Sequence, residues 1–184
     1  RWLVTRNQKY KAKKFFCNGV CNVYNSMKIA VLMGGESNER EISLKSGRAV
    51  EKALRNVGCR VVAIDAVGAY TNILRNESVD VVFIALHGRS GEDGTVQSIL
   101  DTMGLPYTGS GVKASSLALN KILSKQIFEA HDIPTPPYCV LNGDNFHSEF
   151  QEFQSRASFS LPVIVKPASE GSTIGVSLVE DMAD

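Results

Sequence analysis

The stretch "KIAVLMGG", residues 28–35, decides the fold. A short apolar run ends there in two glycines, and apolar residues then recur with the i, i+3, i+4, i+7 spacing of a helix at Val50, Ala53, Leu54 and Val57. Gly58 closes this periodic segment. A buried strand, a glycine turn and an amphipathic helix in this order predict the first unit of an α/β domain.

The same alternation continues along the chain. "CRVVAID" (59–65) and "VDVVFIAL" (79–86) are apolar and rich in β-branched residues, and an amphipathic helix is predicted over residues 96–103, before Gly104. Continuously apolar strands separated by helices indicate a parallel sheet that is covered on both faces. A further helix is predicted from the spacing of Leu119, Ile122, Leu123 and Ile127.

Three prolines in "HDIPTPP" (131–137) exclude further helix and mark a predicted domain boundary. We therefore expect an N-terminal α/β domain over residues 27–132 and the start of a second domain over residues 133–184. In the second, a helical stretch around 144–156 precedes "LPVIVKP" (161–167) and "VSLVE" (176–180), two predicted strands that a glycine loop joins.

Residues 1–26 contain six basic residues and no acidic residue. Such a leader is typical of a transit peptide or a nucleic-acid-binding arm, but Met27 stands directly before "KIAVLM" as a natural start. Vector-derived or upstream-translated sequence is the alternative, and we expect residues 1–26 to lie outside the fold. No apolar run reaches the roughly 20 residues of a membrane helix, and we expect a soluble protein.

The cysteines and histidines do not predict a metal site. Four scattered cysteines form no C-x-x-C pair, and three distant histidines share no ligand spacing. Reduced thiols, and hence a cytoplasmic location, are expected.

"GGESNERE" (34–41) places Glu39 and Glu41 at the start of the first helix, with Ser37 or Asn38 as the predicted cap. Acids in a first turn stabilise the helix dipole by about 0.3–1 kcal/mol, which is a purely structural explanation. The two glycines favour a second explanation, because they let a ligand approach the acid closely. The residues alone leave both open.

"HGRSGEDG" (87–94) follows the third strand directly. Ligands of open α/β sheets bind at the carboxyl ends of the strands, so His87 is a candidate ligand-binding residue, although a structural histidine is the alternative. Asp93 is a candidate cap for the next helix. Loops 34–41 and 87–94 are expected to face one crevice.

"VIVKPASEGSTIG" (163–175) gives the strongest local indication of a ligand. Lys166 ends a strand, and the glycines and hydroxyls that follow it are suited to hold phosphate. The lysine precedes the glycines, so this is not a P-loop, and a plain hairpin loop is the alternative.

Two other motifs lack the context that their function requires. "GSGVKA" (109–114) matches G-x-G-x-x-A, but the segment before it is too short and proline-marked to be a buried first strand. Ser110 and Lys113 form S-x-x-K without its S-D-N and K-T-G companions.

Taken in order, three blocks resemble the D-alanine–D-alanine ligases of the ATP-grasp superfamily: "KIAVLMGGESNEREISLKSG", "VFIALHGRSGEDGTVQSILDTMGLPYTGSGVKASSLALNK" and "LPVIVKPASEGSTIGVSLV". The resemblance spans about residues 28–180. It implies an N-terminal parallel-sheet (pre-ATP-grasp) domain followed by an incomplete ATP-grasp domain. It also implies that ATP drives the joining of two D-alanines through a D-alanyl phosphate, for peptidoglycan precursor synthesis.

The resemblance further implies ATP and Mg²⁺ (or Mn²⁺) as cofactors, D-alanine as substrate, and a homodimer that binds neither nucleic acid nor membrane. It gives Glu39 and Ser172 catalytic roles. The implied substrate-binding residues are Glu39, Ile42, His87 and Ser172, and the implied ATP-binding residues are Lys121, Lys166, Glu170, Gly171, Ser172, Thr173 and Gly175.

The family's metal ligands are expected beyond Asp184, so no metal ligand is assigned and the isolated chain is expected to be inactive. Asn120, Ser98 and Thr173 depart from the residues usual in the family. Three alternatives stay open: a D-alanine–D-lactate or D-alanine–D-serine ligase, a non-catalytic binding module, and, with the least support, a dehydrogenase built on "GSGVKA".

Overall fold

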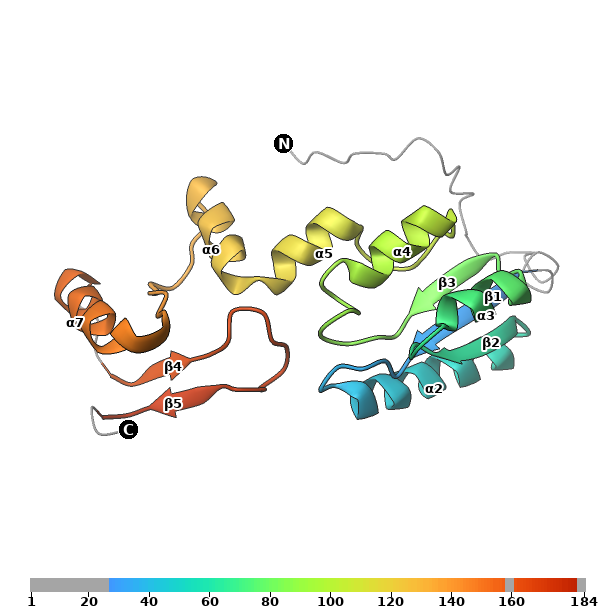
Figure 1. The fold of residues 1–184 in the computed structure, drawn as a ribbon, viewed down its shortest axis with the longest axis horizontal. Coiled ribbons are helices and arrows are strands. Elements are labelled where there is room, and N and C mark those ends of the chain that lie inside the picture. The colour runs from blue at the N-terminus through green and yellow to red at the C-terminus, as the bar shows by residue number, and fades with distance from the viewer. Residues whose placement is uncertain (1–26, 158–160, 182–184) are drawn as a thin grey trace.

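The computed structural model describes residues 27–157 and 161–181, so the leader at 1–26 lies outside the described residues. A parallel sheet with its helices forms one part, and a hairpin with one helix forms the other; α5 and α6 run between them (Figure 1). Within the described ranges, no helix is long and apolar enough to cross a membrane.

The predicted parallel sheet is confirmed. It consists of β1 (Lys28–Met33), β2 (Arg60–Asp65) and β3 (Val81–Ile84) in the order β2-β1-β3. Leu32 of β1 pairs with Ile64 on one side and with Ile84 on the other. Since both neighbours are parallel to β1, the loops after β1 and β3 leave the same edge of the sheet.

Side chains of β1 alternate between two buried layers. Ala30 and Leu32 face a core shared with α3 (Tyr70–Glu77) and α4 (Thr95–Met103), whereas Val31 and Met33 face α2 (Arg40–Asn56). All four are buried. Helices therefore cover both faces, as the continuously apolar strands predicted.

The helices differ from the predictions at two places. Sequence periodicity did not indicate α3, whose mostly polar turns bury one large side chain, Leu74. The single helix predicted around 119–127 is two helices, α5 (Val112–Leu119) and α6 (Lys121–Ala130), which meet at Asn120. The backbone of Asn120 is extended, and its side chain caps α6 instead of continuing α5.

The segment from residue 131 to residue 142 contains no helix or strand and includes the predicted domain boundary. Lys125 of α6 holds its proline-rich portion: Nζ donates to Thr135 Oγ1 at 2.7 Å and to the Pro136 carbonyl at 2.8 Å. The same ammonium lies 4.8 Å from the centre of the Tyr138 ring. The boundary itself stays a prediction.

Beyond this segment come η1 (Gly143–Asn145), α7 (Phe146–Ala157), β4 (Val163–Val165) and β5 (Ser177–Val179). The two strands pair antiparallel, with Ile164 opposite Leu178, which confirms the predicted pair of strands. Residues 166–176 form the glycine loop between them. Figure 1 shows this loop reaching from the hairpin toward the parallel sheet.

Candidate active site

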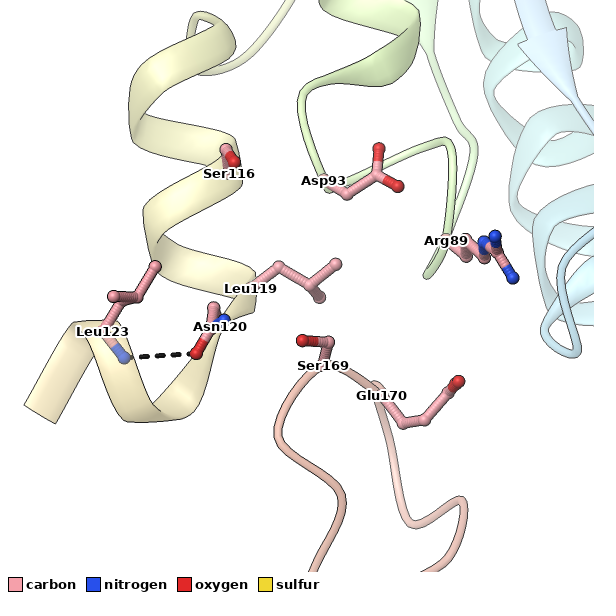
Figure 2. A pocket seen from close by; sticks show the side chains of 8 residues that line it. All are labelled: Arg89, Asp93, Ser116, Leu119, Asn120, Leu123, Ser169 and Glu170. Atoms are coloured by element: carbon pink, nitrogen blue, oxygen red, sulfur yellow. Dashed lines mark hydrogen bonds between the residues drawn. The ribbon is translucent and has the colours of Figure 1, made fainter. Parts of the chain in front are cut away.

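A cavity of about 390 Å³ opens where three parts of the chain approach one another. Figure 2 shows the 87–94 loop on one side, the corner between α5 and α6 on another, and the glycine loop opposite them. Its lining residues are Arg89, Asp93, Ser116, Leu119, Asn120, Leu123, Ser169 and Glu170. The lining combines charges of both signs with two leucines, so the cavity favours no single class of ligand.

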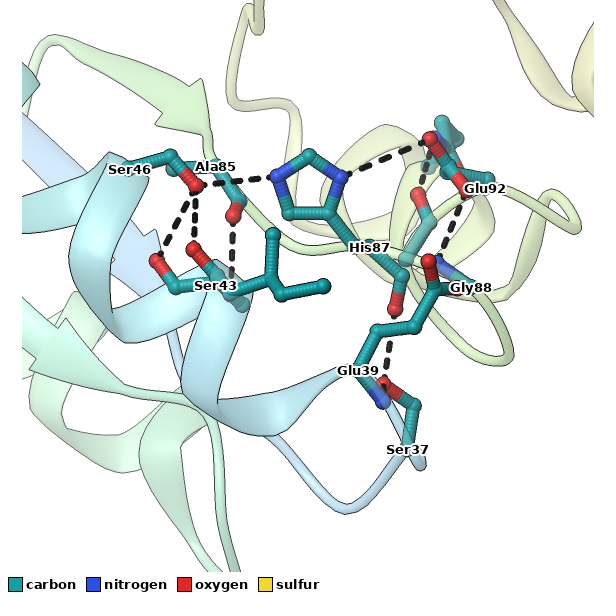
Figure 3. Close-up of polar contacts among 11 residues, drawn as sticks. Ser37, Glu39, Ser43, Ser46, Ala85, His87, Gly88 and Glu92 are labelled. Carbon is teal, nitrogen blue, oxygen red and sulfur yellow. Dashed lines mark hydrogen bonds and ion pairs between the residues drawn. The ribbon is translucent and has the colours of Figure 1, made fainter. Parts of the chain in front are cut away.

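Beside this cavity, the loops after β1 and β3 meet as predicted (Figure 3). Ser37 Oγ donates to the His87 carbonyl at 2.8 Å and accepts from the Glu39 amide at 3.2 Å. In the next turn, Ser43 Oγ donates to the Ala85 carbonyl at 2.8 Å. These bonds tie the start of α2 to the end of β3 and fix the crevice between them.

Glu39 lies at the centre of this crevice. It is the N-cap residue of α2 but caps nothing with its side chain, so the prediction that Ser37 or Asn38 is the cap residue was wrong. Glu39 is 8% exposed, and its Oε2 is buried with no hydrogen-bond partner among the residues that the structure describes. A buried carboxylate oxygen without a partner is costly and is suited to receive a cation.

Two glycines enclose the Glu39 carboxylate from different loops. A Cβ atom on Gly171 would stand 2.8 Å from Glu39 Oε2, and a Cβ on Gly88 would also collide with it. Gly88 has φ +65°, a conformation that side chains disfavour. Backbone without side chains therefore lines the space around the acid, as a closely bound small ligand requires.

His87 is held between α2 and its own loop. Ser46 Oγ lies 2.9 Å from Nε2, and Glu92 Oε1 lies 3.9 Å from Nδ1. Glu92 is fixed in turn, because its Oε2 accepts from the Gly88 amide at 2.8 Å. The ring stays 34% exposed, so a ligand in the crevice has access to it.

Arg40 braces the glycine turn that leads into this site. Its Nη1 donates to the Gly35 carbonyl at 2.9 Å and to Asp65 Oδ1 at 2.8 Å, and Nη2 donates to Asp65 Oδ2 at 2.5 Å. The hydrogen bonds from Arg40 lower the pKa of the Asp65 carboxyl, against a smaller opposing effect of burial. A bidentate pair at the end of β2 therefore sets the path of the turn after β1.

The glycine loop is anchored to α6 through Lys121. The Lys121 amide donates to the Ala168 carbonyl at 2.9 Å, and its ammonium donates to the Glu170 carbonyl at 2.5 Å. Lys166, by contrast, is exposed at the end of β4. Two positive charges thus flank the root of the loop, one bound to its backbone and one facing solvent.

The predicted site residues are only partly brought together. Glu39, His87 and Gly171 adjoin one crevice, and Ile42 is 52% exposed in the first turn of α2. The resemblance to the ligase family also implies a hydrogen bond from Ser172 to Glu39. This bond is not present in the described structure: Gly171 adjoins the carboxylate, while Ser172 is exposed in a left-handed turn with φ +53°. Thr173 and Gly175 are exposed in the same turn.

Sequence reasoning missed Ser46, Arg40 and Asp65. Ser46 lies one helical turn after Ile42, a spacing that puts both on one face of α2, and this spacing was the available signal. Nothing in the sequence pairs Arg40 with Asp65, because their contact depends on β1 and β2 being neighbours. The role of Asp93 was foreseen in part, since its Oδ1 accepts from the Thr95 amide at 2.9 Å at the start of α4.

Two protein-family models match this chain. The model described as D-ala D-ala ligase N-terminus matches residues 70–110, and the one described as D-ala D-ala ligase C-terminus matches residues 127–184, together more than half of the chain. The chain belongs to the D-alanine–D-alanine ligase family. This confirms the resemblance found in the sequence.

Individual D-alanine–D-alanine ligases agree with this assignment. The chain is 54% identical to the one of Geotalea uraniireducens over 154 residues, which cover 83% of this chain and 48% of that protein. A Bacillus anthracis D-alanine–D-alanine ligase structure matches with a TM-score of 0.70 and 34% identity, over 86% of this chain and 51% of that one. A second structure of that enzyme, complexed with ATP, gives a TM-score of 0.67 and 32% identity, over 86% and 52%.

A structure of the VanG D-Ala:D-Ser ligase from Enterococcus faecalis is also similar. Its TM-score is 0.66 at 26% identity, and the match covers 85% of this chain and 56% of that one. The predicted fold class is confirmed by these structural matches. The chain spans about half the length of the curated relatives that it matches.

Proposed function

We propose that the full-length protein containing this chain joins two D-alanines at the expense of ATP, through a D-alanyl phosphate intermediate, for peptidoglycan precursor synthesis in the cytoplasm. Membership of the D-alanine–D-alanine ligase family supports the reaction class. A homodimer is part of the same proposal. The observation that carries the proposal is the buried, unpartnered carboxylate oxygen of Glu39.

The Glu39 carboxylate is suited to bind the ammonium group of the first D-alanine. It is enclosed by backbone at Gly88 and Gly171, which leaves room for a compact, positively charged group and little room for a bulky one. An ammonium group restores the missing partner of Oε2, and a charged hydrogen bond in a water-poor site is stronger than in water. The substrate carboxylate then extends toward His87, on the neighbouring loop.

In the proposed reaction, the carboxylate of the first D-alanine attacks the γ-phosphorus of ATP and releases ADP. The amine of the second D-alanine then attacks the acyl carbon and releases inorganic phosphate. The residues of this chain hold the first substrate by its ammonium group and keep its carboxylate beside His87. Correct positioning of the reacting groups supplies much of the acceleration in such transfers.

The described residues fit a triphosphate better than they fit a metal ion. Lys121 and Lys166 stand at the root of a glycine loop whose backbone can approach phosphate oxygens. Within the described ranges, no three histidine, cysteine, aspartate or glutamate side chains cluster as a metal site. ATP would supply the activating phosphoryl group, and no step is assigned to a metal ion.

The test is D-alanine-dependent phosphate release by the full-length enzyme, with Glu39→Gln against Glu41→Gln. Both variants remove one carboxylate from the first turn region of α2, but only Glu39 lies in the crevice. Losing a buried charge pair predicts that Glu39→Gln lowers kcat/KM for D-alanine by about a hundredfold or more. Equal activity of the two variants would remove the basis of the proposal.

The D-Ala:D-Ser ligase among the similar structures supports a second candidate, a ligase that takes another second substrate. The described crevice binds the first substrate and does not distinguish these candidates. A competition assay of the full-length enzyme would do so, with equal D-alanine, D-serine and D-lactate and mass-spectrometric quantification of the products. We expect D-alanyl-D-alanine to predominate; predominance of either mixed product would replace the first candidate by the second.

A further inference from the structure

The His87 ring contacts polar groups of two different elements. Ser46 of α2 lies at Nε2, and Glu92 of the 87–94 loop lies on the side of Nδ1 (Figure 3). A neutral imidazole carries one proton, so one nitrogen donates and the other accepts. The surroundings of the Ser46 hydroxyl decide which nitrogen carries it.

Ser46 has a single hydroxyl proton, and the Ile42 carbonyl competes for it. Ser46 Oγ lies 2.6 Å from the Ile42 carbonyl oxygen, which can only accept. If the proton pointed toward His87 instead, two oxygen lone pairs would face each other at this short distance with no proton between them. The hydroxyl therefore donates back along the helix, and its lone pair is left to accept from Nε2.

We propose that Ser46 fixes the proton of the neutral His87 ring on Nε2, so that Nδ1 is the nitrogen through which this histidine acts. Nδ1 faces Glu92 Oε1 at 3.9 Å, and this carboxylate oxygen can only accept, so Glu92 supplies no proton to the Nδ1 lone pair. Glu92 is held there by the Gly88 amide. A second proton, or a donor group of a ligand, is thereby directed to Nδ1.

Ser46 is in this scheme a positioning residue, because it acts on the substrate only through His87. The role of Ser46 in catalysis rests on the proposed ligase function, whereas the position of the His87 proton in the free protein does not depend on it. If His87 acts on the first substrate, a second proton on Nδ1 donates a hydrogen bond to the reacting carboxylate, while Nε2 stays bound to α2. The serine thus fixes the orientation of the ring as well as its tautomer.

The test is ¹⁵N NMR of the full-length protein labelled at histidine, without substrates and with the His87 ring in its neutral form. The chain contains His87, His131 and His147, and the signals lost in His87→Gln identify the ring of interest. We expect a protonated Nε2 and an unprotonated Nδ1. A proton on Nδ1, or an averaged mixture of both tautomers, would overturn the proposal without any need for a variant at Ser46.

Two substitutions at Ser46 extend the test. Ser46→Ala should replace the single tautomer by a mixture and lower kcat/KM for D-alanine about fivefold, the usual effect of one lost hydrogen bond. Ser46→Thr keeps the hydroxyl and should restore the Nε2–H signature. An unchanged signature in Ser46→Ala overturns the proposal, whereas an inactive wild-type enzyme with the expected signature overturns only the ligase function.

Discussion

Gly171 and Gly88 approach the same carboxylate from different loops, but they differ in backbone conformation. Gly88 has a positive φ, so an alanine there would strain the backbone as well as meet Glu39. Gly171 does not have a positive φ, and the three atoms nearest to an added Cβ all belong to the Glu39 carboxylate. Substitution of Gly171 therefore isolates the effect of filling the space around the acid.

Gly171→Ala is expected to raise the KM for the first D-alanine at least about tenfold, because the new methyl group takes the space of the ammonium group. Its stability should change little. Gly111→Ala is the matched control: its Cβ would meet only the Tyr107 hydroxyl, at 3.9 Å, an ordinary contact. Steady-state kinetics of both full-length variants test this expectation, which fails if the two variants bind D-alanine equally well.

The Arg40–Asp65 pair predicts a pH dependence of stability. The Arg40 hydrogen bonds lower the pKa of Asp65, so the stabilisation is fully present above the ordinary aspartate pKa of about 3.9 and is lost as pH falls through the lower folded-state value. Wild-type protein should thus unfold at a higher temperature than Asp65→Asn at pH 7, and the difference should shrink below about pH 4.

This difference is measured by thermal unfolding of wild-type protein and Asp65→Asn at about five pH values between pH 2 and pH 7, all at the same ionic strength. A constant difference across the range would mean that the ion pair does not link protonation to folding. Because the pair also fixes the Gly35 carbonyl, Asp65→Asn should weaken D-alanine binding as well.

At the scale of elements, Asn120 determines how α5 is joined to α6. Its Oδ1 accepts from the Ile122 and Leu123 amides, both at 3.1 Å, which satisfies two donors at the start of α6. Asn120→Ala should destabilise the protein by about 1 kcal/mol, and Asn120→Asp, which keeps the accepting oxygen, should not. Urea unfolding of the two variants measures this; equal loss in both would contradict the capping role.

Elements that follow from local pattern were predictable, and those that depend on neighbours were not. The strand over residues 28–33 and the helix stop at Gly104 are visible in composition and glycine placement. The division at Asn120 was not, because the apolar spacing from Leu119 to Ile127 continues through the break. Helix α3 was missed because it contributes mainly Leu74 to the core, too little for a periodic signal.

The site shows the same division. Glu39 and His87 were predictable because both follow buried strands whose carboxyl ends meet at one edge of the sheet. Ser46, which contacts His87 from the second turn of α2, was missed although its spacing from Ile42 was visible, because a serine on an amphipathic helix is normally assigned to the solvent-facing side. Gly171 lies beside Glu39, where Ser172 was expected, because of a loop conformation that no local sequence pattern specifies.

At the scale of the whole molecule, the site combines distant parts of the chain. The crevice joins α2, the 87–94 loop and the glycine loop, and Lys121 connects the last of these to α6. The proline-rich segment that Lys125 holds lies between α6 and the glycine loop in sequence. The relative placement of Glu39 and the glycine loop therefore depends on contacts made by α6 at its first residue, Lys121, and at Lys125 near its middle.

Residues 1–184 prepared alone are expected to show no D-alanine-dependent phosphate release. The chain spans about half the length of its curated relatives. The proposed function assigns to it the first-substrate crevice and the part of the nucleotide site at Lys121, Lys166 and the glycine loop. Incomplete electrostatic stabilisation of a transferring phosphoryl group costs orders of magnitude in rate.

Phosphate release and calorimetric titration with D-alanine and with ATP, on the same preparation of residues 1–184, test this expectation. Turnover above a protein-free control that disappears in Glu39→Gln would contradict it, whereas tight binding of ATP without turnover would favour a binding module over an enzyme that needs its remaining length.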